Sequence, residues 1–97
     1  MTKPWQTLTQ LTGGSPMEIE RVRLTETGIA IEGPFELPPL ALLTAGDQVF
    51  VAEFVLCHGT IKKMEKHFGV SYPTIKNRLN EIGEVLARLN KKGEANG

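Results

Sequence analysis

Residues 58–83 carry a pattern of apolar, glycine and capping residues that restricts the fold more than any other stretch of the chain. Its first half has apolar residues at spacings of three and four, which is typical of one face of a helix. These residues are Ile61, Met64 and Phe68. Gly69 follows them, at the place where a helix C-cap needs a left-handed backbone. We therefore expect a first helix over about 60–68, ended by a glycine turn.

The second half of this stretch begins with residues that favour the start of a helix. Ser71 is a good N-cap, and Pro73 fits the first turn, where its missing N–H costs nothing. The apolar face that follows consists of Ile75, Leu79 and Ile82. Helix, glycine turn and capped second helix together predict a helix-turn-helix, in which the second helix enters the DNA major groove. The alternative is a plain helical hairpin that packs a core and binds nothing.

One residue departs from the usual motif, and several others resemble a known family. Glu65 stands four residues before Gly69, where many helix-turn-helix motifs have a small residue. The stretch nevertheless resembles the helix-turn-helix of the Fis type over about a quarter of the chain. The residues that carry this likeness are Gly59 to Met64, Gly69, Val70, Thr74, Ile75, Lys76, Arg78 and Leu79.

Length and composition limit the class of protein. The chain has 97 residues, of which 40% are apolar and 23% charged, and this suits one ordinary globular domain. No run approaches the roughly 18 apolar residues of a membrane span, and the N-terminus lacks the layout of a signal peptide. We expect a cytoplasmic bacterial protein. The single Cys57 excludes an internal disulfide and a cysteine-rich zinc site, and we expect it to be a small buried residue.

The charged residues are unevenly distributed, although the net charge is zero. Residues 1–57 contain three basic and seven acidic residues, whereas residues 58–97 contain eight basic and four acidic ones. The basic half is the half with the helix-turn-helix. Phosphate binding needs local positive charge, so this asymmetry favours DNA, although a solvated lysine-rich helix would also produce it.

The rest of the chain predicts an α+β, mainly α fold, in which an N-terminal β-hairpin precedes a three-helix helix-turn-helix domain. Thr44 is expected to cap a central core helix over about 45–57, which is apolar on more than one face. Leu86 and Leu89 continue the apolar seam of the last helix and pack either on the core or on a second subunit. The expected segments are an arm or loop over 1–16, a hairpin over 17–39, the helical domain over 40–90 and a disordered tail over 91–97.

The hairpin is expected to have one strand over 17–24, a turn at 25–28 and a returning strand over 28–33, which Pro34 ends. Residues 31–35, Thr44 and the motif as far as Leu79 also resemble a small, uncharacterised bacterial family of presumed transcriptional regulators. In that family a zinc ribbon with two Cys-x-x-Cys knuckles precedes a helix-turn-helix.

The likeness to the zinc-ribbon family covers roughly residues 10–85. Here the knuckle-like turns at 11–14 and 24–28 contain no cysteine, and the only histidines are His58 and His67. Zinc needs about four Cys or His ligands, so we expect a ribbon-like hairpin without metal or other cofactor.

The candidate DNA-binding residues lie on the outward face of the second helix and on the helix before it. Asparagine can pair bidentately with adenine, and lysine can reach guanine or phosphate. Hydroxyl groups near a helix N-terminus can bind phosphate, since the dipole already favours anions there. The candidates are Ser71, Tyr72, Thr74, Lys76, Asn77, Arg78 and Asn80, with Lys62, Lys63 and Lys66 as contacts to the DNA backbone.

Two functions remain open on the sequence alone. The first is a DNA-binding transcriptional regulator that works as a homodimer, since a second copy doubles the base contacts. The second is a protein-interaction or dimerisation module without DNA binding, which the exposed acidic residues Glu81 and Glu84 favour. An enzyme is not expected, because no Cys/His set, Ser/His/acid set or phosphate-binding glycine loop is present at a recognisable spacing.

Overall fold

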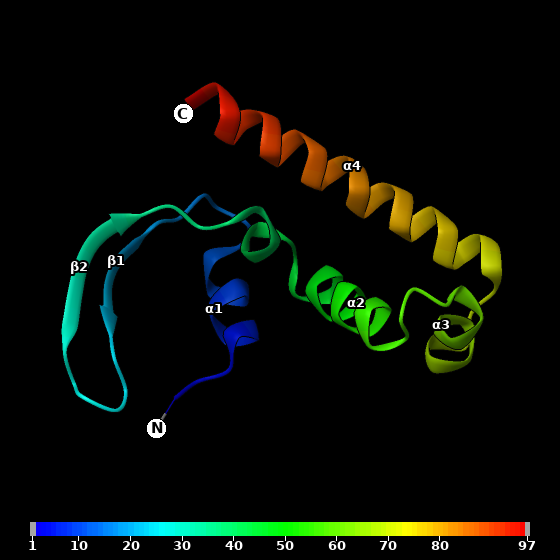
Figure 1. Ribbon diagram of the computed structural model, residues 1–97, viewed down its shortest axis with the longest axis horizontal. Helices are drawn as coiled ribbons and strands as arrows, with labels where there is room; N and C mark the ends of the chain where they lie inside the picture. The colour runs from blue at the N-terminus through cyan, green and yellow to red at the C-terminus, as the bar shows by residue number, and fades with distance from the viewer. Residues whose placement is uncertain (1, 97) are drawn as a thin grey trace. The chain divides into compact units, whose positions relative to one another are not determined.

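The computed structural model describes residues 2–96 and the side chains of residues 2–90. The chain divides into two compact units, Met1–Leu42 and Leu43–Gly97. A two-stranded hairpin lies in the first unit and the main helices lie in the second (Figure 1). The predicted α+β, mainly helical class with an N-terminal hairpin is confirmed.

The first unit begins with a helix where an arm or loop was expected over 1–16. Helix α1 spans Trp5–Thr12 and ends at Gly13, whose φ of 58° gives the left-handed C-cap. Trp5, Leu8 and Leu11 recur every three residues and share one side of it. The Thr- and Gln-rich composition concealed this periodicity, and the apolar side remains exposed, Leu11 most of all.

The hairpin consists of β1 (Ile19–Arg23) and β2 (Ala30–Phe35), paired antiparallel. The Leu24 N–H donates to the Ile29 carbonyl at 2.7 Å, which closes the predicted turn. Strand β2 continues through Pro34, which was expected to end it. Pairing with β1 resumes at Phe35 after a shift in register, so the irregularity absorbs the proline without breaking the strand.

The two faces of the hairpin differ in chemistry. On one face Arg21 and Glu32 are cross-strand partners, and Arg21 Nε lies 3.2 Å from Glu32 Oε1. On the other face Val22 pairs with Ile31, and Leu24 lies next to Ile29. All four apolar side chains remain exposed. The hairpin therefore has a polar face and an open apolar face, as alternation along a strand requires.

The second unit follows a short 3-10 helix, η1 (Pro39–Leu42), and begins with α2 (Ala45–Leu56). The predicted N-cap is confirmed, because Thr44 Oγ1 accepts from the Asp47 N–H at 3.2 Å. The other two helices are α3 (Ile61–Phe68) and α4 (Tyr72–Asn96). The tail expected over 91–97 lies outside the residues whose side chains are described.

The core of the second unit draws on all three helices. Its buried residues are Leu43, Phe50, Cys57, Met64, Ile75 and Ile82. Phe50 stacks on Phe68 with ring centroids 5.3 Å apart. Leu86 packs against this cluster, and Leu89 is half-buried. Of the two interpretations of the α4 seam, core packing therefore describes Leu86.

Two glycines of this unit are expected to respond to alanine with opposite signs. Gly69 has φ of 66°, a backbone that costs an alanine about 1–2 kcal/mol, so Gly69→Ala should lower the free energy of unfolding by about that much. Gly83 lies inside α4 with nothing within 4 Å of an added Cβ, so Gly83→Ala should raise the free energy of unfolding by about 1 kcal/mol. Urea denaturation followed by circular dichroism measures both, and two changes of the same sign would contradict this assignment.

Candidate nucleic-acid interface

The turn between α3 and α4 sets the direction in which α4 leaves the core. The Gly69 N–H donates to the Glu65 carbonyl at 2.8 Å, and the Val70 N–H donates to the same oxygen at 3.2 Å. These bonds satisfy the Glu65 carbonyl, which the end of the helix would otherwise leave open, and they confirm the predicted glycine C-cap. Glu65, the residue that departs from the usual motif, keeps its side chain half-buried beside this turn.

The first turns of α4 have one buried side and one open side. Ile75 and Ile82 are buried in the core. Residues on the other sides of the helix are therefore left to solvent, and the structure places every predicted α4 site residue there. The exposed candidates are Ser71, Tyr72, Thr74, Lys76, Asn77, Arg78 and Asn80. Within this set Ser71 Oγ lies 3.1 Å from Thr74 Oγ1, and Lys76 Nζ lies 6.0 Å from the Tyr72 ring centroid.

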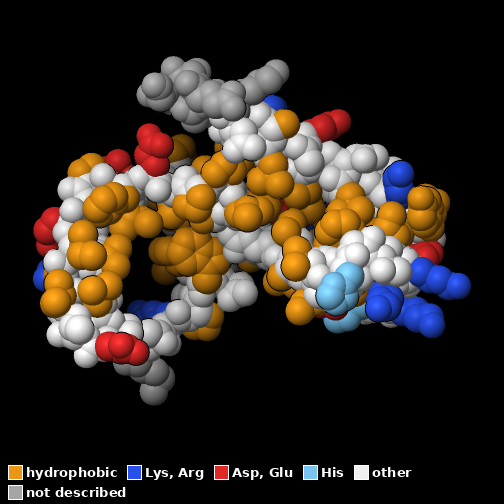
Figure 2. Space-filling model, viewed as in Figure 1, with side chains coloured by type: hydrophobic (Ala, Val, Ile, Leu, Met, Phe, Trp, Pro, Cys, Tyr) orange, Lys and Arg blue, Asp and Glu red, His pale blue; other side chains and the backbone are white. Residues whose placement is uncertain are grey.

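Helix α3 presents a group of cationic side chains. Met64 is fully buried, and Ile61 and Phe68 pack against the same core, so the other sides of this helix face outward. The candidate residues Lys62, Lys63 and Lys66 are exposed. Figure 2 shows Lys and His side chains gathered over this end of the second unit. His67 Nδ1 lies 3.4 Å from Glu53 Oε1 of α2, so this histidine has a carboxylate partner.

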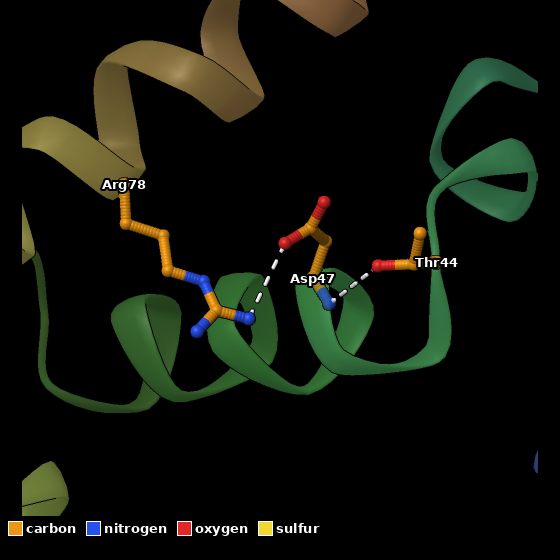
Figure 3. A network of polar contacts seen from close by, with 3 residues as sticks. All are labelled: Thr44, Asp47 and Arg78. Atoms are coloured by element: carbon orange, nitrogen blue, oxygen red, sulfur yellow. Dashed lines mark hydrogen bonds and ion pairs between the residues drawn. The ribbon is translucent and has the colours of Figure 1, made fainter.

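Arg78 has a structural partner that the sequence analysis missed. Its Nη2 atom lies 3.3 Å from Asp47 Oδ1, and its guanidinium carbon lies 5.0 Å from the Phe50 ring centroid. Figure 3 shows the side chain reaching from α4 to the first turn of α2, where Thr44 caps Asp47. Arg78 thus ties α4 to α2. Residues 31 positions apart give no local pattern, so nothing in the sequence pointed to this pair.

Two acidic residues bound the candidate interface on α4. Glu81 and Glu84 are both exposed; Glu81 directly follows Asn80, and Glu84 lies about one helical turn beyond Asn80. A carboxylate near the DNA backbone is repelled by phosphate. The candidate residues of α4, Ser71 to Asn80, therefore lie on the N-terminal side of these carboxylates.

Cys57 lies in the core close to Glu53. Burial and the neighbouring Glu53 carboxylate, 3.6 Å from the sulfur, raise the pKa of the Cys57 thiol. A thiol held in the protonated form is a poor nucleophile. This agrees with the expected packing role. Among the described residues no cluster of three or more His, Cys, Asp or Glu side chains is arranged to hold a metal ion.

Alkylation should report this environment. We expect iodoacetamide to modify Cys57 slowly in the native protein at pH 8 and rapidly in urea, because both burial and the raised pKa deplete the accessible thiolate. Mass spectrometry over time measures the two rates. Equal rates in the native and unfolded chain would show that the thiol is not protected.

The described helices include none that is long and apolar enough to cross a bilayer. No curated protein and no solved structure matches the chain significantly. Residues 43–90 match a family described as Domain of unknown function (DUF2089)-HTH, and this match begins at the first residue of the second unit. Over these residues the second unit is therefore similar to the helix-turn-helix of that family.

Proposed function

We propose that the protein is a DNA-binding transcriptional regulator that reads the major groove with α4 over about residues 71–83. One observation carries the proposal. Lys76, Asn77 and Asn80 are exposed on a helix that is fixed to the core by Ile75 and begins directly after the Gly69 turn. The match of residues 43–90 to a helix-turn-helix family supports it.

Each group on this face has a chemical role in the proposal. Asn77 and Asn80 pair with base edges, adenine being the base that asparagine can pair with bidentately. Lys76 reaches guanine or phosphate. Ser71, Tyr72 and Thr74 donate to phosphate near the N-terminus of α4. Lys62, Lys63 and Lys66 of α3 neutralise the negative charge of the DNA phosphates.

Arg78 has two roles in this account. Its bond to Asp47 holds α4 against α2, and 45% of its side chain remains exposed, which leaves room for a phosphate contact from the flank of the helix. A helix that is held at both its core side and its flank loses less freedom when it binds. Preorganisation of this kind supports sequence reading more than a mobile helix would.

The proposal has further parts that come from the sequence. We propose that the protein acts in the cytoplasm as a homodimer, has no enzymatic activity and needs no cofactor. The hairpin is proposed to be a ribbon-like element without zinc, and the reading helix to be of the Fis type. Two copies related by a twofold axis match a palindromic site. A single copy has one reading helix and makes too few base contacts for useful specificity.

A second candidate function is a protein-interaction module that has this fold without binding DNA. The exposed Glu81 and Glu84 favour it, because they interrupt the polar face of α4 with negative charge. The zero net charge favours it as well. Binding to duplex DNA at low salt separates the two functions.

Fluorescence anisotropy with a labelled mixed-sequence duplex tests the proposal. We expect binding that weakens as salt rises, because lysine contacts release counterions from the duplex. Replacing Lys62, Lys63 and Lys66 together with glutamine should reduce the slope of log K against log salt by about 1 for each lost phosphate contact. Lys3→Gln makes the same kind of substitution at one position outside the second unit and should leave the slope unchanged. No binding at low salt would overturn the proposal in favour of the interaction module.

A further inference from the structure

Helix α2 has an apolar stripe on the side that faces away from its own core. Phe50 is buried, and Val51 and Phe54 pack around it on one side of the helix. On the opposite side Val49 keeps 50% and Leu56 keeps 70% of its surface exposed. Ala45, half-buried, and Ala52, exposed, share that side with them. We call these four residues, Ala45, Val49, Ala52 and Leu56, the α2 stripe.

The spacing of the α2 stripe suits contact with another helix. Its members are separated by four, three and four residues, the spacing that keeps side chains on one narrow seam. Small and large residues alternate along it. A seam of this kind lets two helices approach closely, because each large side chain fits against a small one.

The order of small and large residues favours a second copy of the same helix. When two α2 helices run antiparallel about a twofold axis midway between residues 50 and 51, Ala45 lies opposite Leu56 and Val49 lies opposite Ala52. Every level of the seam then pairs a small residue with a large one. A surface that complements itself about a twofold axis is what an isologous dimer requires.

The charges on α2 are compatible with this arrangement. Asp47 and Glu53 are the charged residues of the helix, and both lie off the stripe. Asp47 is paired with Arg78, and Glu53 is paired with His67. Because neither carboxylate belongs to the stripe, two copies meet without burying a charge in the seam. Antiparallel helices also place opposite ends of their dipoles side by side.

We propose that a second copy of this chain docks on the α2 stripe, with the two α2 helices antiparallel and Ala45 opposite Leu56. This inference rests on the homodimer of the proposed function and does not depend on DNA binding. A contact made by one short helix from each chain lies at the small end of protein interfaces, so the dimer should dissociate on dilution. The stripe lies on α2, so this dimer does not use the exposed face of α4.

Cysteine cross-linking of the full-length chain tests the geometry. In a Cys57→Ala background, Ala45→Cys and Leu56→Cys are prepared as separate proteins. A mixture of the two should form a disulfide-linked dimer under mild oxidation, because residues 45 and 56 lie opposite each other. Each protein alone should not, because copies of the same residue are about 16 Å apart along antiparallel axes, at a rise of about 1.5 Å per residue. A disulfide needs Cα atoms about 6 Å apart.

The mass of the full-length chain, measured without DNA by analytical ultracentrifugation, is the second readout. The unmodified chain should be a dimer at high concentration, and Val49→Glu should make it monomeric while circular dichroism stays unchanged. Val22→Glu introduces the same change on the open face of the hairpin and should leave the dimer intact.

Three results would overturn the inference. The first is a cross-link by either cysteine variant alone, which would mean a parallel or different contact. The second is loss of the dimer with Val22→Glu in place of Val49→Glu, which would assign the contact to the hairpin. The third is a monomeric unmodified chain, which would also remove the homodimer from the proposed function. If the monomer still binds DNA in the anisotropy assay, the proposal that α4 reads DNA is retained.

Discussion

Replacing Met64 with alanine should lower the free energy of unfolding of the second unit by about 2–5 kcal/mol, the usual cost of emptying a large buried site. Met64 is 0% exposed and lies where all three helices meet, so few neighbours can move to fill the cavity. Small domains have only about 5–15 kcal/mol of stability in total. Urea denaturation followed by circular dichroism should therefore show a much lower midpoint, with some of the chain unfolded before urea is added.

Val55→Ala is the matched control for Met64→Ala. It also shortens an apolar side chain within a helix, but Val55 is 68% exposed, so the change in stability should stay within about 0.5 kcal/mol. Equal effects of the two substitutions would mean that the core is not centred on Met64. The family match over 43–90 covers this core, so the result bears on the framework that presents α4.

Asn77→Ala should weaken binding to a preferred duplex by about 1–3 kcal/mol, roughly 5- to 150-fold, and should relax the preference at one base-pair position. Asn77 is exposed on the side of α4 away from Ile75, and its amide can both donate to and accept from a base edge. Removing a bidentate base contact affects the preferred sequence more than others, whereas removing a phosphate contact affects all sequences equally.

Asn90→Ala is the control for Asn77→Ala, because Asn90 is an exposed asparagine far along the same helix. It should leave both affinity and preference unchanged. Anisotropy titrations with the preferred duplex and with a single-base variant of it measure the two effects. If Asn77→Ala weakened binding to both duplexes by the same factor, Asn77 would be a backbone contact and the base contacts would have to come from Lys76 or Asn80.

The elements that the sequence predicted well are those set by local chemistry. The Thr44 cap and the Gly69 turn depend on residues within a few positions of one another, and both appear as expected. The buried faces of α3 and α4 followed from the spacing of Met64, Ile75 and Ile82. Local rules of capping and periodicity determine such features almost independently of the rest of the chain.

Other features depend on contacts or signals that local patterns do not contain. The ion pair of Arg78 with Asp47 joins residues on different helices, so only the folded chain reveals it. Helix α1 has just eight residues, three of them large and apolar, and its polar remainder resembled a loop. The returning strand was expected to end at Pro34, but a register shift lets β2 reach Phe35.

The candidate DNA-binding face was predictable because exposure on a helix follows from burial of the opposite side. Once Ile75 and Ile82 are assigned to the core, the outward positions are fixed by helical geometry. The second role of Arg78 was not predictable in this way, because its partner Asp47 lies on another helix. Helix α2 was expected to be apolar on more than one face, but which of its apolar residues stay exposed depends on the tertiary contacts.

Selection of bound sequences from a pool of randomised duplexes by the full-length chain tests the central claim most directly. The account predicts enrichment of a short motif, palindromic if the dimer forms, and predicts that Asn77→Ala loses the preference at one position of each half-site while Asn90→Ala retains it. A pool that stays random after repeated selection by folded protein would contradict the account and assign α4 to a role other than reading DNA.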